Sequence, residues 1–503
     1  MQGAEERHSH IAIVGTGFAG IGLAVKLQRA GITDFVIFER AEDVGGTWRD
    51  NTYPGCQCDV PSHLYSFSFK LNPNWTRTYS MQAEIWAYLR ATAEEMNVLP
   101  FVRFGHTVTG AKWNDDGARW EIETNHGTFT ADIAISAHGG LAEPAFPQID
   151  GLEEFEGDLF HSAAWNHDID LTGKTVGVVD TGASAVQIVP RIQPKVARMH
   201  VFQRTPAWVL PHTDRRTTTF ERRLYRRVPA AQRLVRNAIY WAREILVFGL
   251  TKNIKLLRPL RSLAVKHMER QISDPELRRK LLPTYSPGCK RLVLSNHFYP
   301  AVAAPNTELV TDRIERVGPR SVITADGRER EIDALVLATG FRVADNPVMG
   351  MARGRDGRSL RDVWSGTGTR AYLGTVVDGF PNFFLMSGPN TGIGHNSLLV
   401  MIEAQIDYTV DTIRYMRDHG VGTVEVKGDV LEAYNRKLQK KMSRTVWTTG
   451  GCSSWYLDDE GRNPTLWPDF TWRFRHLTRS FNPKDFDLRP PARTRRDREL
   501  VDA

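Results

Sequence analysis

Residues 174–187 read KTVGVVDTGASAVQ, and this stretch decides the fold of the middle of the 503-residue chain. Residues 175–179 are an apolar run rich in valine, which predicts a buried β-strand. Small residues follow, and a helical pattern begins after them. Strand, tight turn and helix together form a loop whose backbone N–H groups receive the pyrophosphate of a dinucleotide. The stretch predicts a nucleotide-binding α/β domain, although Asp180 stands where the first glycine of such a loop belongs.

A second loop of this kind lies near the N-terminus. A short apolar strand is predicted just before GTGFAG, which places Gly15, Gly17 and Gly20 at the spacing GxGxxG. A helical pattern and a second apolar strand follow, and that strand ends in Glu39. The glycines let the backbone approach phosphate, and the Glu39 carboxylate can accept hydrogen bonds from ribose hydroxyls. Because a carboxylate repels a 2′-phosphate, this first site is expected to hold FAD or NAD rather than NADP.

The segment after the first loop is rich in Gly, Pro, Asn and Asp. It contains GGTW at residues 45–48, YPG at residues 53–55, and then Asp59. These residue types interrupt regular structure, so a loop is predicted. Two-domain flavoproteins use such a segment to cover the isoalloxazine ring, which makes Thr47 and Trp48 candidate flavin contacts. Asp59 is a candidate active-site carboxylate, whereas a lone loop aspartate is more often a turn former.

The composition is that of an ordinary soluble globular protein, with 41% hydrophobic and 24% charged residues, long enough for about three domains. The net charge is +7, and much of the excess lies between residues 215 and 279 and in the last dozen residues. Nucleic acid or a membrane surface is one interpretation, and a solvated helical face is the simpler one. The sequence lacks an apolar signal segment and any run of about 18 apolar residues. We expect a cytoplasmic protein without a nucleic-acid partner.

The chain has only four cysteines, too few for a disulfide scaffold at this length. A reducing compartment therefore fits. Cys56 and Cys58 are separated by one residue, which is neither the redox spacing CxxC nor half of a usual zinc site. We interpret them as unpaired loop thiols and predict no metal site.

Two apolar segments echo one another: ADIAISAHGG at residues 131–140 and IDALVLATGF at residues 332–341. Each predicts a buried strand that ends in small residues. Flavin disulfide-reductase-like proteins carry this strand-plus-ATG pattern where the chain crosses between nucleotide domains. The first copy departs from the pattern, since His138 stands at the usual threonine.

Residues 220–282 are rich in arginine and have apolar residues at helical spacing. The simplest interpretation is a helical insert, and the alternative is that its apolar stripe contacts a membrane or a partner. The following part, from residue 346, holds loops rich in tryptophan, and those side chains are expected in the core by default. The residues after Lys484 combine Pro490 and Pro491 with many Arg and Asp, which predicts a disordered tail.

The stretch FEGDLFHSAAW gives the pattern FxGxxxHxxxW, with Phe155, Gly157, His161 and Trp165. Together with GGTWxxxxYPGxxxD at residues 45–59, it resembles the type I Baeyer–Villiger monooxygenases, which are class B flavoprotein monooxygenases that use FAD and NADPH. The resemblance extends over about residues 11–472. The stretch GPNTGIGHNS at residues 388–397 looks most like the hydroxyacetophenone-monooxygenase branch. Asn166 departs from the pattern, because the family usually has Pro or Asp there.

The resemblance implies an α/β fold with two Rossmann-like dinucleotide-binding domains. Residues 1–145 and 346–484 would form the FAD domain, the second part contributing substrate-side loops. Residues 146–345 would form the NADP domain, with the helical insert at about 212–285. Residues 485–503 would be the disordered tail.

The resemblance also assigns roles to single residues. Arg291 matches the catalytic arginine and Asp59 the carboxylate that orients it. Arg204, Thr205 and Lys290 match the contacts to the NADP 2′-phosphate, for which a guanidinium fork is suited. The FxGxxxHxxxW residues belong to a linker that couples NADPH position to domain motion. The full set of expected cofactor contacts is Gly15, Gly17, Phe18, Gly20, Glu39, Thr47, Trp48, Gln57, Cys58, Asp59, Tyr65, Val108, Thr181, Gly182, Ala183, Ser184, Ala185, Gln187, Arg204, Thr205, Lys290 and Arg291.

The implied reaction is insertion of one oxygen of O2 next to a ketone carbonyl, through a flavin C4a-peroxide, to give an ester or lactone. Thioether oxidation is an expected side activity, so the expected partners are a small-molecule ketone or thioether and O2. A heteroatom (S- or N-) monooxygenase is the first alternative. A non-catalytic nucleotide-binding protein is the second; Asp180 favours it, and the retained Arg204, Lys290, Arg291 and Asp59 oppose it. A disulfide reductase would need a CxxxxC pair that this sequence lacks.

Asp180 predicts weakened NADPH binding. A carboxylate beside a pyrophosphate adds repulsion of about 1–4 kcal/mol, depending on the local dielectric. If the side chain turns away from the phosphates, only backbone strain at the tight turn remains.

Overall fold

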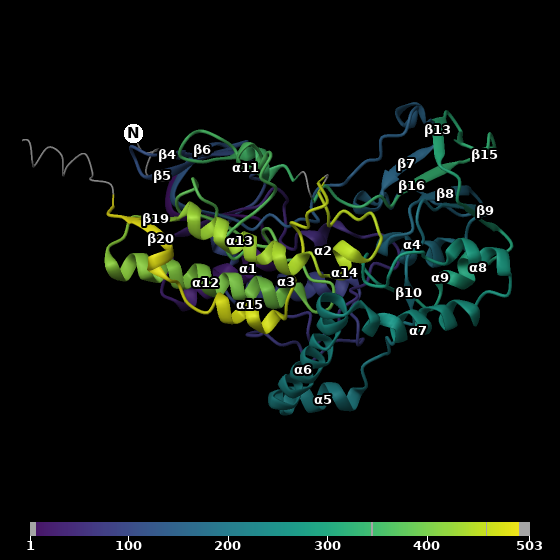
Figure 1. Ribbon diagram of the computed structural model, residues 1–503, viewed down its shortest axis with the longest axis horizontal. Helices are drawn as coiled ribbons and strands as arrows, with labels where there is room; N and C mark the ends of the chain where they lie inside the picture. Colours follow the sequence, from purple (N-terminus) through teal and green to yellow (C-terminus); the bar gives the residue numbers. More distant parts are fainter. Residues whose placement is uncertain (1–6, 344–345, 459, 492–503) are drawn as a thin grey trace, which may run out of the picture.

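Two β-sheets, each covered by helices, organise the chain in the computed structural model, which describes residues 7–343, 346–458 and 460–491 (Figure 1). The sheet built mainly from the first 136 residues lies on the left of Figure 1, and the sheet of residues 158–337 lies on the right. The predicted fold class of two nucleotide-binding α/β units is therefore observed.

The first sheet has the strand order β17-β4-β5-β6-β1-β2-β3, and β18 also pairs with β6. Its centre is parallel: β1 pairs with β2 on one side and β6 on the other. Strands β4, β5 and β6 form an antiparallel meander at one side of this sheet. The strands are β1 (His8–Val14), β2 (Phe35–Phe38), β3 (Val102–Arg103), β4 (Val108–Asn114), β5 (Arg119–Thr124), β6 (Gly127–Ser136), β17 (Ala352–Arg353) and β18 (Phe383–Leu385).

Helices α1 and α12 pack together against this sheet, and their contact faces are apolar and buried. Helix α1 starts one turn after β1, because Gly20 allows the turn and the helix to meet: a Cβ on Gly20 would lie 1.9 Å from the Gly15 carbonyl oxygen. The helices of this unit are α1 (Phe18–Arg29), α2 (Thr47–Asp50), α3 (Gln82–Glu95), α10 (Val348–Met351), α11 (Leu360–Trp364), α12 (Leu398–His419), α13 (Gly428–Met442), α14 (Val446–Thr449) and α15 (Thr471–Leu477), with the 3-10 turn η2 (Leu99–Phe101).

The second sheet is parallel throughout, in the order β12-β9-β8-β16-β7. Its central strands β8 and β16 are buried and largely apolar, as expected of a parallel sheet covered on both faces. The predicted strand at residues 175–179 is β8. The elements are β7 (Asp158–His161), β8 (Thr175–Val179), β9 (Arg198–Phe202), β12 (Thr307–Val310), β16 (Ala334–Leu337), α4 (Ala183–Ile192), α9 (Phe298–Val302), the small sheet β13 (Ile314–Gly318), β14 (Ser321–Thr324) and β15 (Glu329–Glu331), and the turns η3 (Leu152–Glu154) and η4 (Ser162–Ala164).

The two units are joined by two crossing segments that run side by side. Ala145 N donates to Gly340 O at 2.9 Å, and Thr339 Oγ1 donates to Ala145 O at 2.6 Å. Arg342 N also donates to Glu143 O at 2.9 Å. The two echoing sequence segments thus end at one place, where the chain leaves the first unit and where it returns.

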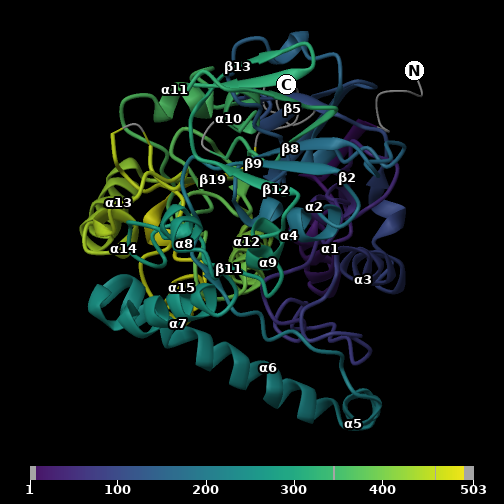
Figure 2. The same ribbon diagram turned by 90° about the vertical axis from the view of Figure 1, so that its right-hand side faces the viewer.

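The predicted insert is helical, and it reaches across both units. Helices α5 and α6 stand off the lower side of the molecule, and α6 follows the lower edge of Figure 2 (Figures 1 and 2). Arg236 Nη1 donates to the carbonyl oxygens of His63, Leu64 and Ser66 at 2.9–3.0 Å, which ties α6 to the first unit. The elements are β10 (Val209–Leu210), α5 (Thr219–Arg227), α6 (Pro229–Glu244), the π-turn η5 (Phe248–Lys252), η6 (Ile254–Leu257), α7 (Arg258–Glu269), α8 (Pro275–Leu281) and β11 (Val293–Leu294).

The chain after Lys484 is partly ordered, which corrects the prediction of a disordered tail from residue 485. β20 (Phe486–Arg489) pairs antiparallel with β19 (Thr423–Val426), and it follows the turn η7 (Pro483–Asp485). Phe486 is buried against Phe481 in the core of the first unit, and this apolar anchor outweighs the polar composition. Residues 492–503 lie outside the described part of the chain.

Two of the four cysteines form a disulfide, which the low cysteine count did not predict. Cys289 and Cys452 are bonded, with their Cα atoms 6.1 Å apart and a sequence separation of 163. The expectation of unpaired thiols is confirmed for Cys56 and Cys58, which are free and buried. Within the described residues, no helix is long and apolar enough to cross a membrane, and no cluster of potential metal ligands occurs.

Cys452→Ser should lower the free energy of unfolding by about 2–5 kcal/mol, because the bond closes a long loop in the unfolded chain. Thermal melting of the native protein and the variant, with and without a dithiol reductant, measures this loss of stability. The reductant should bring the native protein to the variant's melting temperature and leave the variant unchanged. Cys289→Ser and the double variant should have the same melting temperature as Cys452→Ser. If the two substitutions instead lower the melting temperature additively, the loss reflects packing of the cysteine side chains and not the disulfide bond.

Candidate active site

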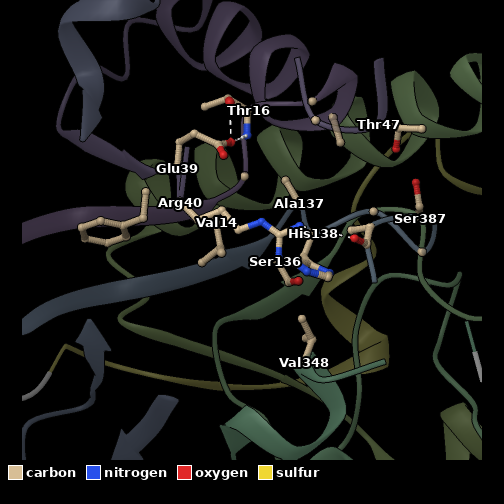
Figure 3. Close-up of a pocket in the computed structure, with 18 of the residues that line it drawn as sticks. Val14, Thr16, Glu39, Arg40, Thr47, Ser136, Ala137, His138, Val348 and Ser387 are labelled. Carbon is tan, nitrogen blue, oxygen red and sulfur yellow. Dashed lines mark hydrogen bonds between the residues drawn. The ribbon is translucent and has the colours of Figure 1, made fainter. Parts of the chain in front are cut away.

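A cavity of about 410 Å³ opens at the carboxyl ends of β1, β2 and β6, beside the start of α1 (Figure 3). Most of the predicted FAD contacts line it. The lining includes Gly15, Gly17, Phe18, Glu39, Thr47, Trp48, Tyr65 and Val108.

Buried Glu39 is fixed at one end of this cavity (Figure 3). Glu39 Oε2 accepts from Thr16 N at 3.1 Å and from Thr16 Oγ1 at 2.5 Å. Glu39 Oε1 accepts from Ala41 N at 3.0 Å and from Arg49 Nη1 at 2.9 Å. Since both oxygens are held, the carboxylate is fixed in position at the end of β2, where a ribose binds in this type of site.

The start of α1 is shaped for a phosphate group. No side chain caps the helix at Gly17, so its first N–H groups point to the cavity without a side-chain acceptor. A Cβ on Gly17 would meet no atom within 4 Å, so the turn leaves open space beside these donors. This is the arrangement that binds a pyrophosphate.

Several residues of the cavity wall were missed by the sequence reasoning. Arg40 Nη1 donates to Glu143 Oε1 at 2.5 Å, and His138 Nε2 lies 3.5 Å from the same oxygen. Burial lowers the pKa of His138, so its imidazole is neutral at pH 7. In the sequence His138 stands out only as a departure from the ATG pattern, whereas the structure places it in the cavity wall (Figure 3). Other missed lining residues are Thr16, Arg49, Ser136, Val348, Ser387, Leu398 and Ile402.

Four of the predicted cofactor contacts in the first unit, Gly20, Gln57, Cys58 and Asp59, are not among the lining residues, and Asp59 is described below with Arg291. Gly20 serves the packing of α1 described above. Gln57 Nε2 donates to Tyr79 O at 2.8 Å and to Asp214 Oδ2 at 2.9 Å. Cys58 Sγ accepts from Val60 N at 3.4 Å, and burial raises the pKa of this thiol well above its usual value, so it is an inert neutral group.

The second nucleotide loop repeats the backbone of the first. Gly15 N donates to Phe38 O at 2.8 Å, and Asp180 N donates to Phe202 O at 3.0 Å, so both turns join two neighbouring parallel strands. Gly15 has φ +104°, and Asp180 has φ +86°. Asp180 therefore adopts the left-handed conformation of the glycine it replaces, which aspartate tolerates better than most residues do.

The Asp180 carboxylate lies across the start of α4 and does not turn away from it. Asp180 Oδ1 accepts from Thr181 N at 2.8 Å, and a Cβ on Gly182 would lie 3.3 Å from Asp180 Oδ2. Burial raises the pKa of Asp180, although the Thr181 hydrogen bond and the charges of Lys290 and Arg204 act in the opposite direction. As at α1, no side chain caps α4 at its first residue, so the helix start is otherwise open to an anion.

Three predicted 2′-phosphate contacts gather near this loop. Thr181 Oγ1 donates to Thr205 O at 3.1 Å, which places Arg204 beside the turn. Lys290 Nζ lies 5.6 Å from the Tyr285 ring centroid, and burial lowers the pKa of Lys290 while the Asp180 charge opposes this. The position equivalent to Glu39, directly after β9, is the neutral Gln203, followed by Arg204. The first site thus carries an acid, and the second carries cations, which suits a 2′-phosphorylated nucleotide.

Gln187 connects the two units. Its Oε1 accepts from Tyr53 Oη at 3.0 Å and its Nε2 donates to Gln57 O at 2.9 Å. The YPG loop can approach α4 because of Gly55, where a Cβ would lie 2.7 Å from Gln187 O. The side-chain amide is engaged with this loop of the first unit, so the predicted contact of Gln187 to the nucleotide stays a prediction.

Asp59 and Arg291 form a two-pronged ion pair between the units. Arg291 Nε donates to Asp59 Oδ2 at 2.6 Å, and Arg291 Nη2 donates to Asp59 Oδ1 at 2.7 Å. The Arg291 side chain is 40% exposed and the Asp59 side chain 27%, so the guanidinium is paired through Nε and Nη2 and is still partly accessible. Burial opposes ionisation of Asp59, but the charge and hydrogen bonds of Arg291 outweigh it and hold the pKa of Asp59 below its usual value. The Asp59 charge raises the pKa of Arg291, so both groups stay charged.

The neighbours of this pair come from distant segments. Cys289, two residues before Arg291, is tied by its disulfide to Cys452, in the loop that leads to buried Tyr456. Arg243, at the end of α6, has Nη2 3.5 Å from Asp59 O and Nη1 3.4 Å from His395 O. The insert, the loop of Cys452 and both nucleotide units therefore meet at one place.

Comparison with known proteins agrees with this architecture. A model of the flavin-binding monooxygenase-like family matches residues 8–350. A Baeyer-Villiger monooxygenase of Pseudomonas aeruginosa is 48% identical over 487 residues, which cover 96% of this chain and 92% of that protein. The closed crystal structure of cyclohexanone monooxygenase has a TM-score of 0.87 at 28% identity, covering 96% of this chain and 99% of that one. The crystal structure of the OTEMO complex with FAD and NADP has a TM-score of 0.85 at 26% identity, and the match covers 96% of this chain and 99% of that one.

The chain belongs to the flavin-binding monooxygenase-like family. Its resemblance to the Baeyer–Villiger monooxygenases, predicted from the motifs, is confirmed, and so is the two-domain fold. The hydroxyacetophenone-monooxygenase branch stays a prediction.

The family signature lies against both crossing segments. His161, at the end of β7, is buried with its ring centroid 5.5 Å from that of Phe146 and 6.1 Å from that of Phe341. His161 Nδ1 accepts from Ala163 N at 3.0 Å, and burial lowers the pKa of His161 to about 4, so the ring is neutral. Trp165 packs edge-on against Phe160 at 4.9 Å, and a Cβ on Gly157 would lie 2.5 Å from Asp333 O. Phe155 is buried in the apolar cluster beneath. These contacts fit the predicted hinge role, which stays a prediction.

Asp180→Asn should lower the NADP⁺ dissociation constant by about tenfold or more at pH 8, because it removes one unit of repulsion worth about 1.4 kcal/mol or more in a partly buried site. The pKa of Asp180 is raised, so protonation relieves the repulsion in the native protein as the pH falls. The difference between the NADP⁺ dissociation constants of the native protein and the variant should therefore become smaller toward low pH. Isothermal titration calorimetry at several pH values measures both constants.

Asp180→Gly separates charge from backbone strain. It should match the affinity of Asp180→Asn and also raise the melting temperature, because glycine relieves the left-handed backbone by about 1 kcal/mol. Equal NADP⁺ affinity of all three proteins would contradict the repulsion.

Proposed function

We propose that the chain is an NADPH-dependent flavin monooxygenase that inserts one oxygen of O2 next to the carbonyl of a small-molecule ketone, giving an ester or lactone. The observation that carries this assignment is the ion pair of Asp59 and Arg291 between the two nucleotide units. A thioether is the second substrate class.

The two nucleotide sites support FAD and NADPH as the cofactors. FAD would be held by the open start of α1, by Glu39 and by the loop of Thr47 and Trp48. NADPH would be held by residues 181–185 at the start of α4, with Arg204, Thr205 and Lys290 toward its 2′-phosphate. When bound, the flavin takes electrons from NADPH and activates O2, so the protein supplies position and charge.

Arg291 supplies a fixed positive charge. Oxygen insertion next to a ketone collects negative charge on the carbonyl oxygen, and a guanidinium that stays ionised stabilises it. Asp59 holds Arg291 in place by two parallel hydrogen bonds and leaves the guanidinium partly accessible. Because the pKa of Asp59 is lowered, Asp59 remains an acceptor for Arg291 at neutral pH.

A heteroatom (S- or N-) monooxygenase shares both cofactors and is the alternative. It places less demand on a fixed cation, because oxidation of a neutral sulfur does not build charge on a carbonyl oxygen. Product mass from one aryl ketone and one thioether separates the two activities. A non-catalytic nucleotide-binding protein would consume no NADPH with either substrate.

Arg291→Ala should retain bound FAD and lose ester formation by about 100-fold or more, since removal of one group that stabilises a developing oxyanion costs about this factor. Flavin absorbance of the purified variant measures cofactor retention, and product mass measures turnover.

Arg291→Lys is the matched control. It keeps the charge but cannot form the two-pronged pair, so it should recover part of the activity. Ester formation by Arg291→Ala at the native rate would overturn the role of Arg291. Loss of FAD from the variant would mean that Arg291 serves the structure of the first site.

A further inference from the structure

Helix α6 has its polarity inverted relative to an ordinary surface helix. The side chains buried along α6 are Gln232, Arg236, Tyr240 and Glu244, at a spacing of four residues and each less than 10% exposed. The opposite side presents Leu234, Trp241 and Ile245, which are 71%, 56% and 67% exposed. A helix on a soluble surface normally buries its apolar side and exposes its polar side.

The buried polar side chains are fully engaged, so α6 cannot simply turn over. Gln232 Nε2 donates to Asn72 O at 2.7 Å, and Arg236 binds three carbonyl oxygens as described. Glu244 accepts from Thr471 N at 3.0 Å and from Asn396 Nδ2 at 2.7 Å. Turning the helix would leave these polar groups without partners, which costs more than the exposed apolar side chains do.

The exposed apolar side continues beyond the helix. Phe248, in η5, is exposed and packs edge-on against Phe470 with ring centroids 5.1 Å apart. Trp472, at the start of α15, is exposed and 5.9 Å from Phe470. The Arg473 guanidinium lies 5.2 Å from the Trp472 ring centroid. Together with Leu234, Trp241 and Ile245, these residues form the α6 face. Helix α6 itself runs along the lower side of the molecule (Figures 1 and 2).

The charge of the surrounding segment identifies what can cover this face. Residues 212–285 contain eighteen Lys and Arg against six Asp and Glu, a formal charge of +12, whereas the whole chain carries +7. The rest of the chain is therefore net negative. Two copies meeting at this face would bring like charges together. An apolar face rich in tryptophan and flanked by Arg matches helices that lie in the interface of an anionic lipid layer.

We propose that the α6 face binds the surface of an anionic membrane, with Leu234, Trp241 and Ile245 inserted among the acyl chains and Arg/Lys of residues 212–285 against the headgroups. The protein lies on the membrane, in keeping with the lack of a spanning helix in the described chain. Arg243, on the same helix, reaches Asp59, so the bound surface would adjoin the seam between the units.

Co-sedimentation with vesicles tests the proposal. The full chain with bound FAD should sediment with vesicles of phosphatidylcholine and phosphatidylglycerol, and less than about one tenth as well with phosphatidylcholine alone, because several cations each favour an anionic surface. Added salt should weaken the binding. The triple variant Leu234→Ser, Trp241→Ser, Ile245→Ser should lose at least about tenfold in partition, with unchanged flavin absorbance.

Matched controls separate this face from general effects. Leu99→Ser removes an exposed leucine elsewhere and should leave partition unchanged. Arg227→Glu with Arg233→Glu should abolish the preference for phosphatidylglycerol, whereas Arg320→Glu with Arg328→Glu, on the hairpin of β13, β14 and β15, should keep it. Equal binding to both vesicle types, or native partition of the triple variant, would overturn the proposal. So would a dimer in sedimentation velocity that the triple variant dissociates, because a second copy would then cover the face.

Discussion

The ion pair of Asp59 and Arg291 depends on the relative position of the two nucleotide units. Asp59 follows the loop that covers the first site, and Arg291 belongs to the second unit, close to the insert. Two short hydrogen bonds with matched geometry fix distance and angle together, which a single contact cannot do. Gln187 on α4 and Arg236 on α6 add further ties between the units. Because the ion pair is partly exposed, it contributes little to the free energy of unfolding, and its main effect is to orient the Arg291 guanidinium.

The two nucleotide loops have the same backbone arrangement but differ in the charged residues beside it. Both turns make the same hydrogen bond to the neighbouring strand and both helices begin without a side-chain cap. The difference is electrostatic: the acid Glu39 follows β2, whereas Gln203 and then the cation Arg204 follow β9, in keeping with the predicted exclusion of a 2′-phosphate from the first site and its binding at the second. Asp180 breaks the symmetry by placing a carboxylate where the second ligand carries its own negative charge. Lys290 and Arg204 oppose that charge, so the site compensates in part for a residue that fits the backbone but not the ligand.

Local patterns predicted strands β2, β8 and β16 well because these are largely apolar runs between strong turn signals. The glycine spacing predicted the first site, and the residues that line the cavity from GTGFAG and GGTW follow from it. Contacts between distant segments could not be predicted in this way. Arg40 and His138 meet through Glu143, and Cys289 and Cys452 are bonded at a sequence separation of 163, so neither has a local signal. The helical spacing of residues 220–282 predicted α6 but not which side is buried, because its hydrogen bonds with residues 63–66 and Thr471 decide that. The polar composition after Lys484 predicted disorder, because it gave no sign that Phe486 would be buried.

The paired crossing segments have a mechanical consequence. A single flexible linker lets two bodies tilt and twist freely, whereas two adjacent segments joined by backbone hydrogen bonds act as a hinge with one axis. His161 packs against an aromatic residue of each segment, so it sits at that axis. Rotation about it would sweep the α4 end of the second unit past the first site while both sheets keep their internal register. If the predicted hinge role holds, the tandem connection would convert a change at the second nucleotide into movement along one path.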